Sequence, residues 1–261
     1  MRTAFFAALT GRVVFTYSIG NFGTLRCLEQ IRNDVCYHGA NVKVVAVGGG
    51  LAYGNLGVTH HASEDVAILR ALPNMTVVSP GDPIEAALAT RAVAALDGPC
   101  YLRLGKAGEP VVHEDEPRFE LGRALVLREG ADITLIASGG MLATASSVAT
   151  QLAEKGVSVR LLSMHTIKPI DREAVTEAAN QTKLIFTLEE HSVEGGLGGA
   201  VAEVLAELEP GHAPLKRIGL RPEFNKVVGD QKYLKATHGL DEEGVMKTIQ
   251  TMITRSYGLV G

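Results

Sequence analysis

Several features that would point to particular functions are scarce in this 261-residue sequence. Tryptophan is absent and aromatic residues make up only 5% of the chain, so the core must be built mainly from Ala, Val, Leu and Ile. There is no long basic run and the net charge is −4, which argues against a nucleic acid as the main partner. No apolar run is long enough to predict a membrane span. With 46% apolar and 21% charged residues, the composition is typical of a globular protein.

Cysteine is also rare. Cys27, Cys36 and Cys100 form no CxxC pair, and the first two lie nine residues apart in one predicted helix, on roughly opposite faces. We therefore expect reduced thiols and a cytoplasmic protein. The first residues, MRTAFFAALTGRVVF, weakly resemble a secretion signal, but Gly11 and Arg12 interrupt the apolar stretch.

Apolar strands alternate with amphipathic helices along the whole chain, which predicts two successive three-layer α/β domains with largely parallel sheets. A polar, acidic segment at 107–118 is predicted to be a linker, which places the domains at 1–113 and 114–261. Strands are predicted at 13–18, 42–48, 75–79, 100–104, 132–138, 157–163, 183–190 and 215–220. Helices are predicted at 24–38, 63–72, 81–96, 141–155, 171–181, 197–208 and 241–254.

Two of these helices have recognisable N-termini. In the helix at 81–96, Asp82 can cap the first turn, Pro83 suits the first helical position, and Glu85 completes a capping box. For the helix at 63–72, Ser63 is the predicted cap, followed by acidic residues that favour the positive end of a helix.

The glycine-rich loop 48–60 ends in two adjacent histidines, His60 and His61. The loop matches neither a Walker motif nor a GxGxxG turn, and it could serve only as a strand-to-helix crossover that needs positive φ angles. Adjacent side chains point in different directions, whereas helical metal ligands are spaced three or four residues apart, so we predict no metal site. A single histidine facing a ligand pocket is the favoured interpretation.

Two further segments follow predicted strands, where ligands bind in sheets of this kind. Arg103 and Lys106 in YLRLGKAGEP suit a phosphate or a carboxylate, although both could be solvated surface charges. In EEHSVEGGLGGAVAEVL, His191 and several glycines precede a helix whose N-terminus could hold an anion. Close backbone packing explains the same glycines equally well.

Six segments, in this order, together resemble the transketolases, which depend on thiamine diphosphate: TLRCLEQIRNDVCYH, GNLGVTHH, LRALPNMTVVSPGDPIEA, DGPCYLRLGKAGEP, HTIKPID and EEHSVEGGLGGAVAE. The match is to the pyrimidine-binding and C-terminal domains, as in the second subunit of a split transketolase that performs ketol transfer between sugar phosphates. Deoxyxylulose-phosphate synthases are similar and remain an alternative. The β subunits of 2-oxoacid dehydrogenases are more distant, because their substrates carry no sugar phosphate.

The resemblance implies roles for particular residues. Phe22 would stack on the aminopyrimidine of the cofactor, and Tyr17 would line the same pocket. The step Thr59-His60 places His60 rather than His61 against the substrate, and Lys106, with Arg103 as a second candidate, would bind the sugar phosphate. An N-terminal transketolase subunit would hold the diphosphate and its Mg²⁺, in a homodimer or heterotetramer whose active sites lie between chains.

This sequence departs from the family pattern at two places. Leu56 stands where many transketolases have an aspartate, so contacts to the donor hydroxyls would differ. The glutamate that activates the cofactor is not found, since no Glu or Asp precedes Glu29. Two explanations stay open: an N-terminally shortened chain, or a non-catalytic transketolase-like protein with an assembly or regulatory role. The first elements of the domain would also be missing, which should expose apolar surface.

Overall fold

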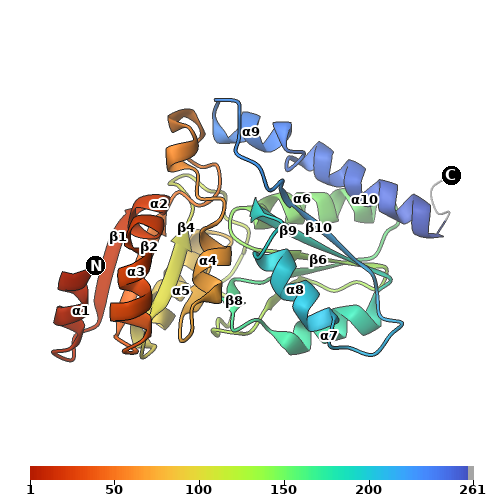
Figure 1. Ribbon diagram of the computed structural model, residues 1–261. Coiled ribbons are helices and arrows are strands. Elements are labelled where there is room, and N and C mark those ends of the chain that lie inside the picture. The colour runs from red at the N-terminus through yellow and green to blue at the C-terminus, as the bar shows by residue number, and fades with distance from the viewer. Residues whose placement is uncertain (258–261) are drawn as a thin grey trace.

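The structure, a computed structural model, describes residues 1–257 and consists of two α/β domains side by side (Figure 1). Both sheets are built from short apolar strands, and most of their connections contain a helix, as the sequence predicts. The elements of the first part of the chain are α1 (Arg2–Ala8), β1 (Val14–Ile19), α2 (Gly20–Gly23), η1 (Leu25–Cys27), α3 (Leu28–Gln30), η2 (Ile31–Cys36), β2 (Val42–Val47), η3 (Gly54–Leu56), η4 (Val58–His60), α4 (Asp65–Ala71), β3 (Thr76–Val78), α5 (Pro83–Ala95) and β4 (Cys100–Leu104).

The first sheet has the order β1-β2-β4-β3-β8, and its pairs are parallel except for β3 with β8. One face of this sheet packs on α1, η2 and α4, with Ile31, Val35 and Leu69 completely buried. The other face packs on α5 through Ala89 and Val93. This arrangement is the predicted three-layer domain.

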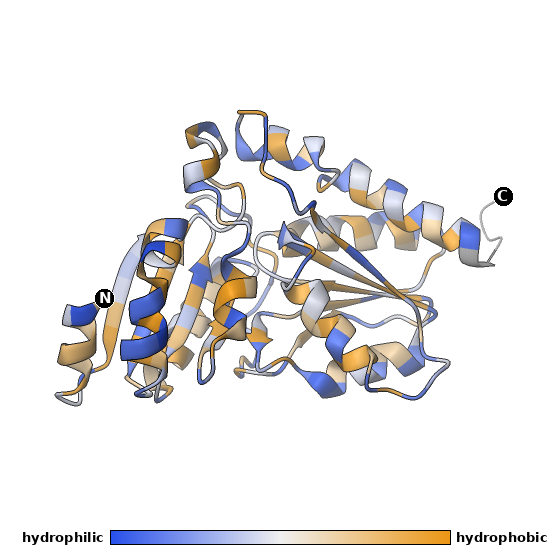
Figure 2. Ribbon diagram, viewed as in Figure 1, coloured by the Kyte–Doolittle hydropathy of each residue, from blue (hydrophilic) through white to orange (hydrophobic). Residues whose placement is uncertain are grey.

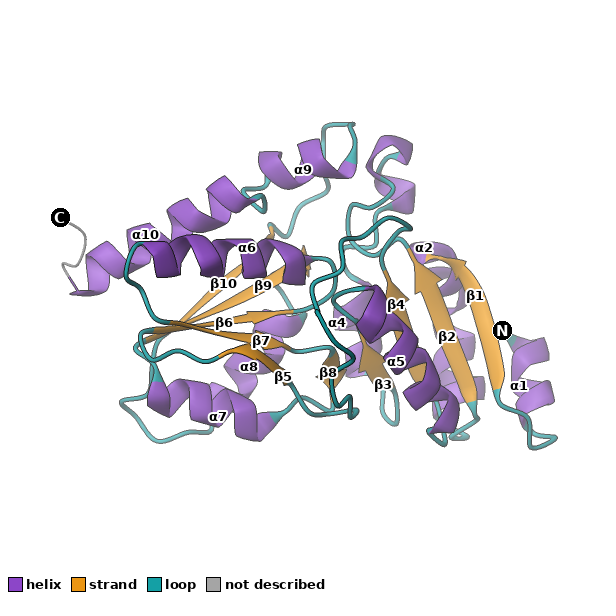
Figure 3. Ribbon diagram, turned by 180° about the vertical axis from the view of Figure 1, so that it is seen from behind, coloured by secondary structure: helices purple, strands orange, loops and turns teal. Residues whose placement is uncertain are grey.

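The second domain repeats the three layers. Its elements are β5 (Leu125–Arg128), β6 (Ile133–Ala137), α6 (Met141–Glu154), β7 (Val159–Ser163), β8 (Thr166–Lys168), α7 (Arg172–Gln181), β9 (Leu184–Ser192), α8 (Leu197–Leu205), β10 (Leu215–Leu220), α9 (Gln231–Thr237) and α10 (Glu242–Tyr257). The sheet order is β10-β9-β6-β7-β5, with only β5 antiparallel to its neighbour. Figure 3 shows α6 and α10 on one face and α7 and α8 on the other.

The two domains are joined by more than the linker. Strand β8 follows β7 in the chain, yet it pairs with β3 in the sheet of the first domain. Lys168 of β8 donates from Nζ to the carbonyls of Arg70 and Leu72 at 2.9 and 2.5 Å. Arg70 in turn pairs with Glu203 of α8. The second domain therefore supplies one strand to the first sheet. The predicted domain boundary between residues 113 and 114 stays a prediction.

Several local predictions are confirmed and others are wrong. Asp82 accepts from the Glu85 amide at 2.7 Å and Pro83 opens α5, as predicted, but the Glu85 carboxylate accepts from Gly81 rather than from the cap residue. Ser63 does not cap α4; its hydroxyl donates to the Glu64 carboxylate instead. The single helix predicted at 24–38 is a broken series of short helical turns. The predicted elements do not include α2, α9, β5 or β8.

Large apolar side chains are exposed along the N-terminal edge of the first sheet. Tyr17 is 70% exposed on the edge strand β1, and Phe6 and Leu9 are more than 60% exposed on and beside α1. This exposure agrees with the apolar surface expected there. On α10, by contrast, apolar and polar residues alternate along the helix (Figure 2), and its apolar side chains are buried in the core of the second domain. Within residues 1–257, no helix is long and apolar enough to cross a membrane.

Candidate functional site

The loop between β2 and α4 is closed at its base by a small antiparallel bridge. Gly50 and Ala62 exchange two backbone hydrogen bonds, each 2.9 Å long. Inside the loop, His61 is buried and its Nε2 lies 3.2 Å from the Gly54 carbonyl. His61 is therefore a structural residue of the loop, and His60 is left to face outward from the end of η4.

His60 and Phe22 come together at the carboxyl ends of β1 and β2. Their ring centroids are 5.0 Å apart in an edge-to-face arrangement, and the guanidinium of Arg26 lies 4.9 Å from the Phe22 centroid. Asn21 donates to the His61 carbonyl, which ties α2 to the end of the loop. On the His60 ring, Nδ1 lies 3.0 Å from the Thr59 hydroxyl, so Nε2 is the nitrogen available to a ligand.

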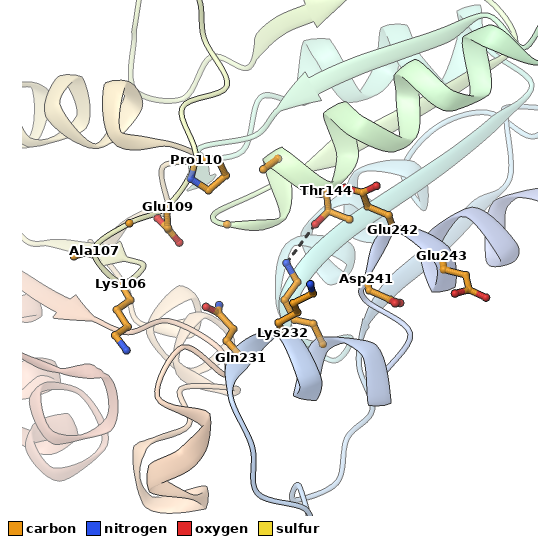
Figure 4. Close-up of a pocket in the computed structure, with 14 residues that line it drawn as sticks. Lys106, Ala107, Glu109, Pro110, Thr144, Gln231, Lys232, Asp241, Glu242 and Glu243 are labelled. Atoms are coloured by element: carbon orange, nitrogen blue, oxygen red, sulfur yellow. Dashed lines mark hydrogen bonds between the residues drawn. The ribbon is translucent and has the colours of Figure 1, made fainter.

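Lys106 follows β4 and is exposed, with its Nζ 5.7 Å from the centroid of Tyr53 in the same loop as His60. It also lines a cavity of about 940 Å³ between the linker, α6 and α9. Figure 4 shows Gln231 between Lys106 on one side and Lys232 on the other. Lys106 is thus close to the loop that carries His60 and available to an anion.

Arg103 is placed differently from Lys106. Its side chain is buried, and Nε donates to Asp65 at 2.8 Å while Nη2 donates to the carbonyls of Ala62 and Glu190 at 2.8 and 3.0 Å. Through these contacts Arg103 links the base of the loop to the second domain. The surface-charge alternative is wrong for this residue, and Lys106 is the better candidate for binding substrate.

Asp65 and Arg103 form a buried ion pair. Asp65 therefore has a role in addition to its place in the first turn of α4. Tyr101 donates its hydroxyl to the same carboxylate oxygen as Arg103, and His191 Nε2 lies 3.9 Å from the other oxygen. Burial raises the pKa of Asp65, but the charge of Arg103 and the hydrogen bonds from Arg103 and Tyr101 outweigh burial and lower the pKa below its ordinary value. The carboxylate is therefore charged at neutral pH.

His191 and the glycines after it have structural roles. Burial lowers the pKa of His191, whose Nε2 accepts from the Ala67 amide at 3.3 Å. The N-terminus of α8 is occupied by a carboxyl group of the chain itself, because Glu189 accepts from the amides of Leu197 and Gly198 at 2.7 and 2.8 Å. Of the two alternatives for this segment, close packing is the one that the structure supports for the glycines, since Glu189 already uses two amides of the helix N-terminus.

Glu190 connects the loop to the second domain. Its carboxylate accepts from the Leu51 amide at 2.7 Å and from Gln231 of α9 at 2.9 and 3.0 Å. Nearby, burial and the charge of Glu190 raise the pKa of Glu109 to about 7. No sequence motif links Tyr53 or Gln231 to Lys106, since only the fold brings them beside it, whereas Glu109 lies in the same segment YLRLGKAGEP.

The residues expected to bind the aminopyrimidine of a thiamine cofactor fit that ring only in part. Phe22 offers a ring beside His60, whereas Tyr17 lies on β1 and makes no ring contact among the described residues. Residues 1–28 contain no carboxylate that could bond a pyrimidine nitrogen. Among residues 1–257, no group of three or more His, Cys, Asp or Glu is arranged to hold a metal ion.

Comparison with known proteins gives matches over both domains. The pyrimidine binding domain of transketolase matches residues 3–108, and the transketolase C-terminal domain matches residues 122–245. An apulose-4-phosphate transketolase subunit of Phocaeicola vulgatus is 41% identical, over 92% of this chain and 76% of that protein. A 6-deoxy-6-sulfo-D-fructose transketolase subunit of Clostridium sp. is 39% identical, over 95% of this chain and 76% of that protein. A solved split-gene transketolase, described as an inactive beta4 tetramer, is 38% identical with a TM-score of 0.89, covering 97% of this chain and 80% of that one.

Proposed function

The chain belongs to the transketolase family, and on this premise we propose that it is the second subunit of a split transketolase acting on sugar phosphates. An N-terminal partner subunit would complete the active site, in a homodimer or a heterotetramer. The names of the relatives support a sugar with an anionic end, since one is named for a sugar phosphate and the other for a sulfonated sugar.

The observation that carries this proposal is the meeting of Phe22 and His60, 5.0 Å apart at the mouth of a loop fixed at its base. Such a pair offers an aromatic platform next to a hydrogen-bonding group. The exposed ammonium of Lys106, beside Tyr53 of the same loop, adds a charge for a phosphate or a sulfonate.

Each residue then has a binding role. His60 Nε2 would hydrogen-bond the donor sugar near its reacting carbon, and Lys106 would hold the anionic end, which fixes the sugar between them. Thiamine diphosphate with Mg²⁺, held mainly by the partner, supplies the nucleophilic carbon of ketol transfer. None of residues 1–28 carries a carboxylate, so cofactor activation is assigned to no residue of the given sequence.

The test is reconstitution with a cognate diphosphate-binding subunit, thiamine diphosphate, Mg²⁺ and a donor and acceptor sugar phosphate. We expect ketol transfer, and a loss of about 10- to 100-fold in kcat/KM for His60→Ala, the effect of removing one strong hydrogen bond to substrate. His212→Ala, in the loop before β10, is the matched control. Absence of turnover by the unchanged pair would contradict the proposal.

A non-catalytic assembly or regulatory subunit is the second candidate function, and the missing carboxylate favours it. In that case the chain would bind the partner subunit without supporting turnover. Size-exclusion chromatography with light scattering on the same mixture separates the two, since a stable complex without ketol transfer supports the second candidate. The exposed residues along α1 and β1 offer apolar surface for such association.

We also propose a cytoplasmic location. Cys27, Cys36 and Cys100 are all free in the structure, which is compatible with a reducing compartment. Burial raises the pKa of the Cys36 thiol to about 11 and that of Cys100 to about 12, so both stay protonated and unreactive.

A further inference from the structure

One side of the loop that carries His60 rests on the second domain. Gly54 of η3 lies against the Gly229 carbonyl and the side chain of Leu234, so that a Cβ added at Gly54 would meet these atoms at 2.5 and 2.6 Å. Figure 1 shows the same proximity between α9 and the helical turns of the loop. The position of the loop therefore depends on α9.

The polar part of this contact is centred on Glu190. Its carboxylate is buried between the Leu51 amide at the start of the loop and the side-chain amide of Gln231, the first residue of α9. Gly50 allows the close approach, since a Cβ there would lie 2.6 Å from Glu190 Cγ. The buried Glu190 carboxylate thus has two donors, the Leu51 amide of the loop and the side chain of Gln231.

Loss of that second donor has a predictable effect. A buried carboxylate with too few hydrogen bonds moves toward water or another donor, because an unsatisfied buried charge is unfavourable. Gln231 borders the 940 Å³ cavity, so a route to water is close (Figure 4). When Glu190 moves, the Leu51 amide loses its acceptor, and the base of the loop keeps only the Gly50–Ala62 bridge and the hydrogen bond from Arg103 to Ala62.

We infer that Gln231 is a positioning residue for the substrate-facing loop: through Glu190 it holds the Leu51 amide and thereby sets where His60 stands. The contacts of Gln231, Glu190 and Leu51 do not depend on any reaction. Their effect on substrate binding through His60 rests on the proposed function. The C-terminal domain thus takes part in the active site through a contact that positions the loop.

Hydrogen–deuterium exchange of the full chain tests the contact without any activity. In Gln231→Leu, we expect peptides covering 49–62 to exchange about 10- to 100-fold faster, the effect of losing one hydrogen bond to a charged group. Peptides from β6 should not change. Gln151→Leu is the matched control, because Gln151 makes the same kind of bond to Glu242, at 3.0 Å between α6 and α10.

Gln231→Lys keeps a donor for Glu190 and should retain slow exchange in 49–62. Equal exchange in Gln231→Leu and the unchanged chain would overturn the inference, and so would fast exchange in Gln231→Lys with β6 unchanged. If Gln231→Leu also speeds exchange in β6, Gln231→Ala takes its place in the same comparison.

The reconstituted enzyme gives the second readout. A misplaced His60 loop should raise KM for the donor several-fold in Gln231→Leu, with a smaller change in kcat, and Gln231→Lys should restore KM. A purely structural defect would instead lower kcat with the folded fraction and leave KM unchanged. If the unchanged pair shows no turnover, the proposed function fails, and the exchange experiment alone decides the role of Gln231.

Discussion

The buried pair of Asp65 and Arg103 predicts a large loss of stability for Asp65→Asn. The substitution keeps the shape but removes the charge, which leaves the Arg103 guanidinium buried without its counter-ion. Breaking such a pair at one partner costs about 3–5 kcal/mol. Because Arg103 keeps two backbone carbonyls, at 2.8 and 3.0 Å, we expect the lower end of this range, about 3 kcal/mol.

Urea unfolding at pH 7, followed by circular dichroism, measures this loss as a shift in the midpoint multiplied by the slope. The control is Glu207→Gln, which removes the acid of the exposed pair with Arg172 and should cost less than about 1 kcal/mol. A loss below about 1 kcal/mol for Asp65→Asn would refute the reasoning, because it would mean that the buried charge of Arg103 needs no partner.

The stabilisation by the pair of Asp65 and Arg103 should depend on pH. The pKa of Asp65 is lower in the folded chain than its ordinary value, so its contribution to stability is complete above that ordinary value, about 4, and is lost as pH falls through the folded pKa. The difference between Asp65→Asn and the unchanged chain should therefore be full at pH 7 and shrink below about pH 4. A difference that does not depend on pH would assign the effect to shape instead of charge.

Two further predictions concern the cavity. Lys106→Gln should raise KM about 10-fold or more for phosphorylated sugars and much less for unphosphorylated ones, as steady-state kinetics of the reconstituted enzyme would show; equal effects on both would argue against a phosphate contact. Burial raises the pKa of Glu109 to about 7, so stability should fall as pH rises from about 4.5 through 7. Glu109→Gln should flatten this part of the urea midpoint profile and make the chain more stable than the unchanged one at about pH 8.

The fold could be predicted largely because its signals are local. The continuous apolar runs of β2 and β6 indicate strands buried on both faces, and the Asp82-Pro83 step marks the start of α5. Elements whose formation depends on a distant partner were not predicted. Strand β8 has only three residues and becomes a strand because β3 offers it a free edge.

The site divides in the same way. Phe22 and His60 could be named from the resemblance to transketolases, and the structure brings their rings to 5.0 Å, while their roles stay predictions. Arg103 and Lys106 are three residues apart with similar chemistry, and only the tertiary structure separates them. Arg103 lies within β4 and points into the domain contact, whereas Lys106 lies beyond the strand end, in solvent.

The two adjacent histidines show how backbone geometry decides between function and structure. His60 is the last residue of the 3₁₀ turn η4, and His61 is extended with φ −75° and ψ 126°. This change in direction turns one imidazole outward to Phe22 and buries the other against the Gly54 carbonyl. Because Gly54 also touches α9, the inner histidine and the second domain hold the same point of the loop. The outward position of His60 is therefore a property of both domains together: the resemblance to transketolases implies it, whereas the pair of histidines alone does not show it.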